Sequence, residues 1–230
     1  MNNENTDINM LEGIEQECKY YSLQDGLDVN NSFTVMHMNA RSMKNKFDDI
    51  KCIISRDNVE WDVVCITETW LKDDVVKYYH IDGYSMFATC RTGSEGGGTL
   101  IYVNEKFEVK RRNDFECPDV ESTFVELYLQ MQTGQRSIII GGIYRPPNYL
   151  NTQFFDYIEK TLEVLGNENK LTFLVGDFNY NLLEGQGGTS AQMFINLLAS
   201  YGFTPMITLP TRVQNQQESL LDNLFINDLR

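Results

Sequence analysis

Apolar positions along this chain follow two different spacings. Short runs rich in β-branched residues are typical of strands, whereas apolar residues that recur every three or four positions are typical of amphipathic helices. The first pattern predicts strands over residues 33–39, 61–67, 84–90, 99–103, 121–131, 137–144, 171–177 and 219–227. The second predicts helices over residues 45–56, 152–165 and 190–201, and it permits a short helix over 10–20.

The order of these elements predicts an α/β fold. The chain begins with strand, helix and strand joined by short links, which is typical of a βαβ unit, and hairpins follow. Strand 121–131 alternates apolar and polar residues, so we expect it to be half exposed, and residues 133–136 provide a hairpin turn to strand 137–144. Gly166 is expected to cap the C-terminus of the second helix, and Ser190 the N-terminus of the third.

Two regions are predicted from the distribution of charge. Residues 1–31 carry seven acidic side chains and one lysine without a sustained apolar period, so we expect a flexible, acidic leader. Residues 32–230 are expected to form one domain, because the chain is 42% hydrophobic and 12% aromatic and shows no internal repeat.

Composition excludes several classes of protein. No apolar run approaches the ~20 residues that span a bilayer, and the N-terminus lacks the features of a signal peptide, so we expect an intracellular protein with no membrane partner, either nuclear or cytoplasmic. The chain has five widely spaced cysteines and no C-x-x-C pair. Neither a disulfide framework nor a zinc site is therefore indicated, and buried reduced thiols are expected.

The net charge of −14 opposes long-range attraction to nucleic acid. A nucleic-acid function would need a local basic surface or a bound divalent cation, which reverses the local field in a carboxylate-lined cleft. The basic run Lys110-Arg111-Arg112 is interpreted as a solvated strand end rather than a binding patch.

The stretch Leu171–Asn179 combines a buried strand with candidate chemistry. Its apolar run ends in Gly176, Asp177, Phe178 and Asn179. A carboxylate that accepts a proton beside a neutral carboxamide that steadies negative charge suits the attack of water on a phosphate. The alternative is that Asp177 and Asn179 only begin a turn, as these residue types often do.

Other polar residues also stand at the ends of predicted strands. Asn39 ends the first strand and Glu68 follows the second, while Asp222 lies at the start of the last. Glu68 could alternatively be the N-cap or a first-turn acid of a following helix. His37 lies two residues before Asn39 and on the same face, and is interpreted as a hydrogen-bonded core histidine rather than a catalytic one.

Tyr144 and Arg145 end a strand that the two following prolines interrupt. A phenol and a guanidinium can hold a phosphodiester, although stacking and a surface ion pair are the ordinary alternatives. The glycine-rich segment 91–98 lacks the ending of a phosphate-binding P-loop and precedes a strand, so we interpret it as a hairpin loop. Arg91 could still reach a phosphate.

Six short motifs resemble one family when they are taken together and in order. They are MNARS, ITETWL, GGGTLIYV, GIYRPPN, LVGDFN and LLDNLFIN, and they extend over residues 33–227. In this order they resemble the endonuclease/exonuclease/phosphatase superfamily, and more narrowly the apurinic-type endonuclease domain of jockey-like non-LTR retrotransposon polyproteins. The resemblance implies a four-layer α/β/β/α sandwich of two mixed sheets flanked by helices, and hydrolysis of DNA phosphodiesters with Mg²⁺ or Mn²⁺.

The resemblance also implies roles for individual residues. Glu68 and Asn39 would hold the metal, and Asp177 would align or deprotonate the attacking water. Asn179 and Tyr144 would hold the scissile phosphate, and Asp222 would orient a catalytic histidine. The residues that would contact substrate are Arg145, Asn148, Arg91 and Thr211. Oxygen ligands and the lack of Cys/His clusters fit a hard cation.

One part of the family pattern is absent. The family closes with a Ser-Asp-His motif on a final strand, whereas this sequence ends at Arg230, shortly after Asp222. We therefore expect the final strand to be missing, the activity to be impaired and an exposed sheet edge to permit association. The reverse transcriptase that usually follows such a domain is also absent. The alternatives are an inactive nucleic-acid- or protein-binding remnant and, within the fold, a phosphoinositide or sphingomyelin phosphodiesterase.

Overall fold

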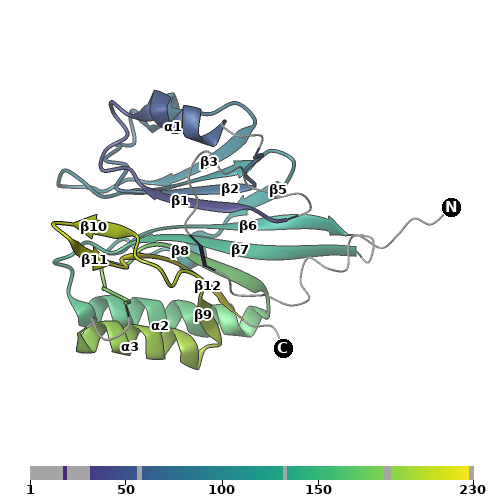
Figure 1. The fold of residues 1–230 in the computed structure, drawn as a ribbon. Coiled ribbons are helices and arrows are strands. Elements are labelled where there is room, and N and C mark those ends of the chain that lie inside the picture. Colours follow the sequence, from purple (N-terminus) through teal and green to yellow (C-terminus); the bar gives the residue numbers. More distant parts are fainter. Residues whose placement is uncertain (1–17, 20–31, 56–58, 132–133, 184–187, 228–230) are drawn as a thin grey trace.

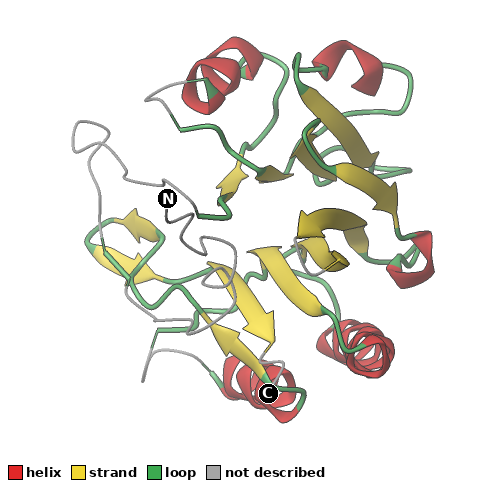
Figure 2. Ribbon diagram, turned by 90° about the vertical axis from the view of Figure 1, so that its right-hand side faces the viewer, coloured by secondary structure: helices red, strands yellow, loops and turns green. Residues whose placement is uncertain are grey.

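Two β-sheets face each other in the middle of the molecule, and helices cover their outer faces (Figure 1). The computed structural model describes residues 18–19, 32–55, 59–131, 134–183 and 188–227. Figure 2 shows the same layers after a turn of 90°, with the strands between the helices. The predicted four-layer arrangement of two mixed sheets flanked by helices is confirmed. Most of the expected leader, including all but two residues of the helix expected over 10–20, lies outside the described residues.

The smaller sheet has four strands and lies under one helix. Its strands, in spatial order, are β1 (Val35–Asn39), β2 (Val63–Thr67), β4 (Thr99–Asn104) and β3 (Tyr84–Thr89). Strands β1 and β2 are parallel and are linked through helix α1 (Phe47–Ile54), which confirms the expected βαβ beginning. The short 3₁₀ helix η1 (Val76–Tyr79) precedes β3. Among the described strands, β1 forms one edge of this sheet.

The larger sheet has six strands. In spatial order they are β5 (Glu108–Arg111), β6 (Glu121–Met131), β7 (Gly134–Tyr144), β8 (Leu171–Asp177), β12 (Asp222–Asn227) and β9 (Phe203–Pro205). The helices α2 (Asn151–Glu168) and α3 (Thr189–Ser200) lie on its outer face (Figure 1). The 3₁₀ helix η2 (Asn113–Phe115) follows β5, and β10 (Arg212–Gln214) and β11 (Gln217–Ser219) form a separate hairpin.

Three apolar cores separate the four layers. One lies between α1 and the smaller sheet and includes Ile50 and Tyr102. A second fills the space between the sheets, with Ile101 from one sheet and Ile140 from the other. The third joins the larger sheet to α2 and α3 and is mainly aromatic; its buried rings include Phe124, Phe154, Phe178, Phe194 and Phe225. Because both faces of both sheets meet an apolar layer, the strands read as continuous apolar runs in the sequence.

Several local expectations are corrected by the structure. Strand β6 is not half exposed, because Ser122 to Leu127 are buried between the sheets and α2. Gly166 lies inside α2, and Asn169 takes the left-handed conformation after the helix, with φ 50°. Ser190 is the second residue of α3 rather than its cap, and its hydroxyl accepts a hydrogen bond from Asn151.

The short strands and the thiols were also poorly predicted. Strands β5, β9, β10 and β11 have three or four residues each, too few to show a period in the sequence. All five cysteines are free, as expected, but Cys65 is buried whereas Cys52 is exposed. In the described part of the chain, no helix is long and apolar enough to span a bilayer.

The structure explains why a glycine, Gly176, precedes Asp177. A Cβ atom built on it would lie far inside van der Waals contact with the backbone oxygen of Ile143 on the neighbouring strand. Strands β7 and β8 can therefore stay paired up to Tyr144 and Asp177 only because this position has no side chain.

A buried charge cluster closes the other end of the larger sheet. The Arg112 guanidinium donates hydrogen bonds to Asp114, Glu126 and Glu168, and Lys170 donates to Glu126 and Glu168. The expected solvated role of the basic run is therefore wrong for Arg112, which is buried. Arg112 lowers the pKa of Asp114 and of Glu168. Burial raises the pKa of Glu126, but hydrogen bonds from Lys170, Ser137 and Arg112 outweigh that effect and lower it overall.

We predict that Arg112→Met lowers the free energy of unfolding by up to about 3–5 kcal/mol at neutral pH, because it removes the buried guanidinium that pairs with the buried carboxylate of Glu126 and with Asp114 and Glu168. A carboxylate with a lowered folded-state pKa stabilises the protein above its unfolded pKa, and this stabilisation is lost as the pH falls through the folded-state pKa. The deficit should therefore narrow below about pH 4. Urea unfolding of both proteins at several pH values measures the difference in their free energies of unfolding.

The matched control is Lys110→Met, because Lys110 is exposed and two residues away. This variant should stay within about 0.5 kcal/mol of the parent protein. An Arg112→Met deficit that is the same at pH 7 and pH 3 would show that the lost free energy comes from packing rather than from charge.

Candidate active site

The topology brings the polar strand ends together at one edge of the sandwich. The parallel pairs β1–β2 and β7–β8 end at Asn39 beside Thr67 and at Tyr144 beside Asp177. Strand β12 is antiparallel to β8, so its first residue, Asp222, lies opposite Asp177. The predicted positions therefore meet because carboxyl ends of parallel strands share an edge, and an antiparallel neighbour brings its start to the same place.

Asn39 links the two sheets through its side chain. Its amide nitrogen donates to Glu68 Oε1 at 2.7 Å and to Asp177 Oδ2 at 2.8 Å, so that one NH₂ group serves a carboxylate from each sheet. Its amide oxygen accepts a hydrogen bond from the backbone of Arg41 at 3.1 Å. The position of Asn39 is thus fixed by three contacts, and it separates two carboxylates that would otherwise repel each other.

The turns that carry Asn39 and Glu68 are braced against each other. Beyond the strands, the backbone nitrogens of Ala40, Ser42 and Met43 donate to the carbonyls of Thr67, Glu68 and Thr69. Four non-glycine residues in these turns have positive φ, namely Arg41, Ser42, Glu68 and Trp70. Such conformations cost free energy and cluster at functional sites. Glu68 is therefore neither the N-cap nor a first-turn acid of a helix, which was the alternative left open by the sequence.

Asp177 is the most perturbed carboxyl of the site. It is 5% exposed, and burial raises its pKa to about 7, with further raising by the charges of Asp222 and Glu68. Hydrogen bonds from Asn39 and from the backbone of Asn179 act in the opposite direction. A carboxyl that exchanges its proton near neutral pH is suited to general-base chemistry.

Tyr144 contributes a neutral phenol. Burial raises its pKa, and the charges of Glu68 and Asp177 raise it further, so the hydroxyl keeps its proton at neutral pH. Tyr144 can therefore donate a hydrogen bond in the same space in which Asp177 can accept a proton.

Asn179 and Arg145 are joined to each other beside the site. Asn179 has φ 50°, its backbone nitrogen donates to Asp177 Oδ1 at 3.0 Å, and its side-chain nitrogen donates to the carbonyl of Arg145 at 2.8 Å. The Arg145 guanidinium is buried, donates to Tyr149 and Asn151, and lies 4.2 Å from the centroid of Tyr180. Arg145 therefore supports the loop under the site. Its guanidinium lies over the Tyr180 ring, as in the stacking alternative that the sequence left open for Arg145.

Asp222 has two contacts that extend the site. Thr211 donates its hydroxyl to Asp222 Oδ2 at 2.9 Å, so the structure brings these two separately predicted site residues together. His37 Nδ1 lies 3.7 Å from Asp222 Oδ1, and His37 Nε2 lies 3.2 Å from the hydroxyl of Thr67. Burial lowers the pKa of His37, and the charge of Asp222 raises it in part. His37 is hydrogen-bonded, as expected from the sequence, but it also faces a site residue.

The glycine-rich segment forms the remaining rim. Arg91 forms an ion pair with Glu121 at 2.5 Å and lies 5.9 Å from the centroid of the Tyr144 ring. Glu121 also accepts from the backbone of Gly98, and a Cβ atom on Gly97 would clash with its carboxylate. The segment is the expected hairpin loop between β3 and β4. Asn148 is exposed after β7, and no contact among the described residues joins it to the site.

The residues present fit a hard divalent cation. Glu68, Asp177 and Asp222 offer carboxylate oxygens, and the buried Oδ1 of Asp222 has no hydrogen-bond partner among the described residues. Within the same part of the chain, no three His, Cys, Asp or Glu side chains form a ready metal cluster. Mg²⁺ is usually held by one or two carboxylates together with water, whereas a structural zinc needs four closed ligands.

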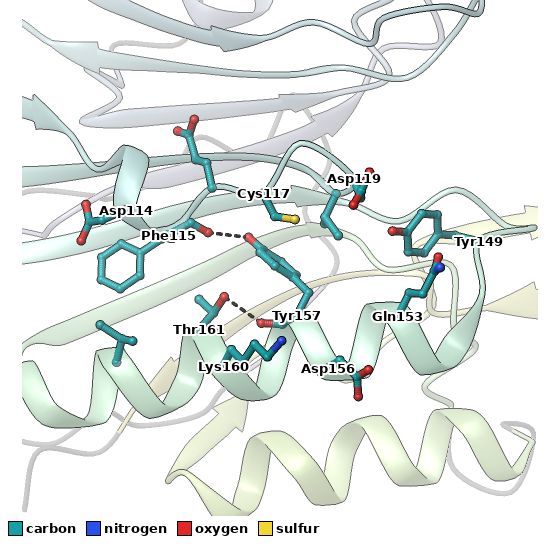
Figure 3. A pocket seen from close by; sticks show the side chains of 13 residues that line it. Asp114, Phe115, Cys117, Asp119, Tyr149, Gln153, Asp156, Tyr157, Lys160 and Thr161 are labelled. Carbon is teal, nitrogen blue, oxygen red and sulfur yellow. Dashed lines mark hydrogen bonds between the residues drawn. The ribbon is translucent and has the colours of Figure 1, made fainter.

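A separate hollow lies on the outer surface between η2 and α2 (Figure 3). Its volume is about 390 Å³, and Tyr157 crosses it to donate a hydrogen bond to the backbone oxygen of Phe115 at 3.0 Å. None of the strand-end residues lines it. The acids at its rim include Asp114 and Glu116, which already pair with Arg112 and Arg111. It is therefore distinct from the candidate site.

A family model described as the endonuclease/exonuclease/phosphatase family matches residues 29–228. The chain belongs to this family. A search of curated proteins gives no match.

Several solved structures share this fold. The endonuclease domain of TRAS1, a telomere-specific non-LTR retrotransposon, is 13% identical, with a TM-score of 0.62 over 84% of each chain. The catalytic domain of APE2 from Xenopus laevis is 11% identical, with a TM-score of 0.64 over 84% of this chain and 82% of that one. The 3′ phosphatase NExo from Neisseria, bound to a product DNA hairpin, is 12% identical, with a TM-score of 0.59 over 84% and 86%.

We predict that Asn39→Asp lowers the free energy of unfolding by about 1–3 kcal/mol in the presence of a chelator, because it replaces a shared donor by a third negative charge. Added Mg²⁺ should restore more of the melting temperature in this variant than in the parent protein. Thermal unfolding in EDTA and in Mg²⁺ measures both effects. Asn148→Asp is the control, since Asn148 is exposed at the same end of the sandwich. Equal melting curves for all three proteins would contradict the bridging role of Asn39.

Proposed function

We propose that this chain is a metal-dependent phosphodiesterase that nicks DNA. The observation that carries the proposal is the position of Asp177, a buried carboxyl with its pKa near neutrality, between a carboxamide, a phenol and two further carboxylates. Water attack on a phosphodiester needs a base, a donor to the phosphate oxygens and a cation that offsets charge, and the site offers groups for all three.

Each residue has a part in this proposal. Glu68 and Asn39 would hold Mg²⁺ or Mn²⁺, and the bound cation would act as a Lewis acid on the phosphate oxygens. Asp177 accepts the proton of the attacking water. Because its pKa is about 7, its carboxyl group can hold that proton near neutral pH. The Tyr144 hydroxyl and the Asn179 carboxamide hold the scissile phosphate, and the Thr211 hydroxyl keeps Asp222 in place. Arg91 and Asn148 contact the DNA backbone next to the scissile phosphate. Arg145 does not touch the substrate but holds the backbone of Asn179 in place.

The surface beside the site supports a polyanionic substrate. Although the chain is acidic overall, Arg41, Lys44 and Lys46 follow directly after Asn39, and all three are exposed. Lys46 is turned back to the carbonyls of Ala40 and Arg41 and stabilises the turn. Arg41 and Lys44 remain available to contact backbone phosphates, which supplies the local basic surface that a nucleic-acid substrate requires.

Two observations support a retroelement origin. The motifs GIYRPPN and LVGDFN resemble the endonuclease domain of non-LTR retrotransposons, and TRAS1 is among the structural neighbours. We propose that the chain has this origin, with a reverse transcriptase domain encoded in the parent polyprotein. The edge strand β1 offers a surface for association.

We predict that Asp177→Asn reduces plasmid nicking by at least about 10³-fold in Mg²⁺ or Mn²⁺, because it removes the proton acceptor while keeping the shape of the side chain. Chelation by EDTA should abolish nicking by the parent protein. Asp156→Asn is the matched control, since Asp156 is exposed on α2. If DNA is bound in Mg²⁺ but never nicked by the parent protein, the chain is a binding module rather than an enzyme.

We predict that replacing Arg41 and Lys44 together by glutamine weakens DNA binding, because two phosphate contacts are lost. The logarithm of the DNA association constant falls linearly with log[salt]. The magnitude of this slope should decrease by about 0.9 for each contact removed. Fluorescence anisotropy over a range of salt concentrations measures this slope. Lys110→Gln, at an exposed lysine on β5, should leave it unchanged. Turnover of inositol phosphates or sphingomyelin with no binding of DNA would instead favour a lipid-directed phosphodiesterase.

A further inference from the structure

An exposed tryptophan stands next to the candidate metal ligand. Trp70 lies in the turn after β2, two residues beyond Glu68, and is 48% exposed. Most large apolar side chains of the two sheets are buried, whereas this indole is presented at the rim of the site. The motif ITETWL contains it, but no role could be assigned to it from the sequence alone.

The pose of Trp70 is fixed although the ring is exposed. Its backbone has φ 56°, and its backbone nitrogen donates to the carbonyl of Gly97 at 2.8 Å. Its indole nitrogen donates to Glu68 Oε2 at 3.4 Å, while Asn39 occupies the other oxygen of the same carboxylate. These contacts tie the ring to the carboxylate that is expected to bind the cation.

The backbone of Gly96 lies against the indole. A Cβ atom built on Gly96 would be 3.7 Å from the indole nitrogen and 3.9 Å from Cε2. Gly96 has φ 92°, a conformation that glycine adopts readily, so the loop can approach the ring closely. A rigid aromatic ring that is supported by the loop and by Glu68, and is still about half exposed, has a surface available for a ligand.

The position of this surface indicates the chemistry of the ligand. The ring neighbours Glu68, the proposed metal ligand, and Gly96. Gly96 also lies beside Arg91, and Arg91 lies over the Tyr144 ring. A partner of the ring would therefore be attached to the phosphate that is bound at this site. A nucleobase has a flat π-face, and stacking on an aromatic side chain contributes about 1–3 kcal/mol per base. An inositol headgroup offers no such flat partner, and a choline headgroup would contact the ring through its cationic nitrogen rather than by stacking.

We propose that Trp70 is a substrate-binding residue that stacks on an unpaired nucleobase next to the scissile phosphate. This inference rests on the proposed nuclease function and deepens it, because it assigns the substrate as DNA with at least one base outside the duplex stack. Sites that are already single-stranded or distorted are then bound more tightly than a regular duplex, since less unstacking is needed.

The chain offers a direct readout, because it contains only two tryptophans, Trp61 and Trp70. In a Trp61→Phe protein, all indole fluorescence comes from Trp70. Titration with a single-stranded oligonucleotide in Ca²⁺, with Asp177→Asn added to prevent cleavage, should quench this fluorescence. The same oligonucleotide with abasic analogues in place of its bases should bind through its backbone but quench much less.

Three variants separate stacking from the hydrogen bond to Glu68. Trp70→Phe keeps an aromatic face but loses the indole donor, Trp70→Leu keeps only apolar volume, and Trp70→Gln keeps a donor without a ring. We predict that Phe stays within about threefold of the parent dissociation constant, whereas Leu and Gln raise it by about 5- to 150-fold, as the loss of one stacked base implies. Melting temperatures of all three verify the fold.

The outcomes distinguish this inference from the function on which it rests. Unchanged affinity and nicking in Trp70→Leu, with no quenching of Trp70, would overturn the stacking role and leave the nuclease intact. A loss in Trp70→Phe as large as in Trp70→Leu would assign Trp70 to positioning Glu68 and also overturn it. If the parent protein neither binds nor nicks any oligonucleotide in Mg²⁺ or Mn²⁺, the proposed function itself fails.

Discussion

The hydrogen bonds from Asn39 to Glu68 and to Asp177 hold the two halves of the site in register. Glu68 follows a strand of the smaller sheet, and Asp177 ends a strand of the larger one. The sheets also meet through apolar side chains, which fix their separation but are non-directional, and through hydrogen bonds such as that between Thr99 and Thr123. The contacts of Asn39 add a directional link at the edge of the apolar layer that carries the candidate site. Backbone hydrogen bonds between the turns after β1 and β2, together with the left-handed backbone of Glu68, also fix the positions of Asn39 and Glu68.

The sequence predicted most long strands well because they are buried on both faces, whereas the sandwich arrangement was implied by the resemblance of the motifs to a known family. Continuous apolar runs such as Leu171–Asp177 are easily recognised, and helix spacing identified α1, α2 and α3. Strand β6 was misjudged because its alternating polar residues are satisfied inside the protein: Thr123 bonds to the hydroxyls of Thr89 and Thr99, and Glu126 to Arg112 and Lys170. An alternating pattern indicates exposure only when the polar side chains lack internal partners.

The site was predictable only in part for a related reason. Residue type and a place at the end of a strand are visible in sequence, so Asn39, Glu68, Tyr144, Asp177 and Asp222 could be named. The partners of these side chains depend on register and on the packing of one sheet across the other. The inward turn of Arg145, the approach of His37 to Asp222 and the support of Trp70 by Gly96 arise from contacts between segments far apart in the chain. No local pattern encodes such contacts.

Two groups of carboxylates in this protein, each with one buried member, follow opposite electrostatic rules. Around Arg112, each acid has a cation within hydrogen-bond distance, and the pKa values of Asp114, Glu126 and Glu168 are lowered. At the candidate site, burial, together with the charges of Asp222 and Glu68, raises the pKa of Asp177 to about 7, and its hydrogen-bond partners are neutral donors. The first group is complete and holds the fold together. The second group requires either a proton or an external cation, so binding of a divalent ion there should release a proton from Asp177 near neutral pH. Charge that is left uncompensated by the protein itself is what distinguishes a binding site from a structural ion-pair network.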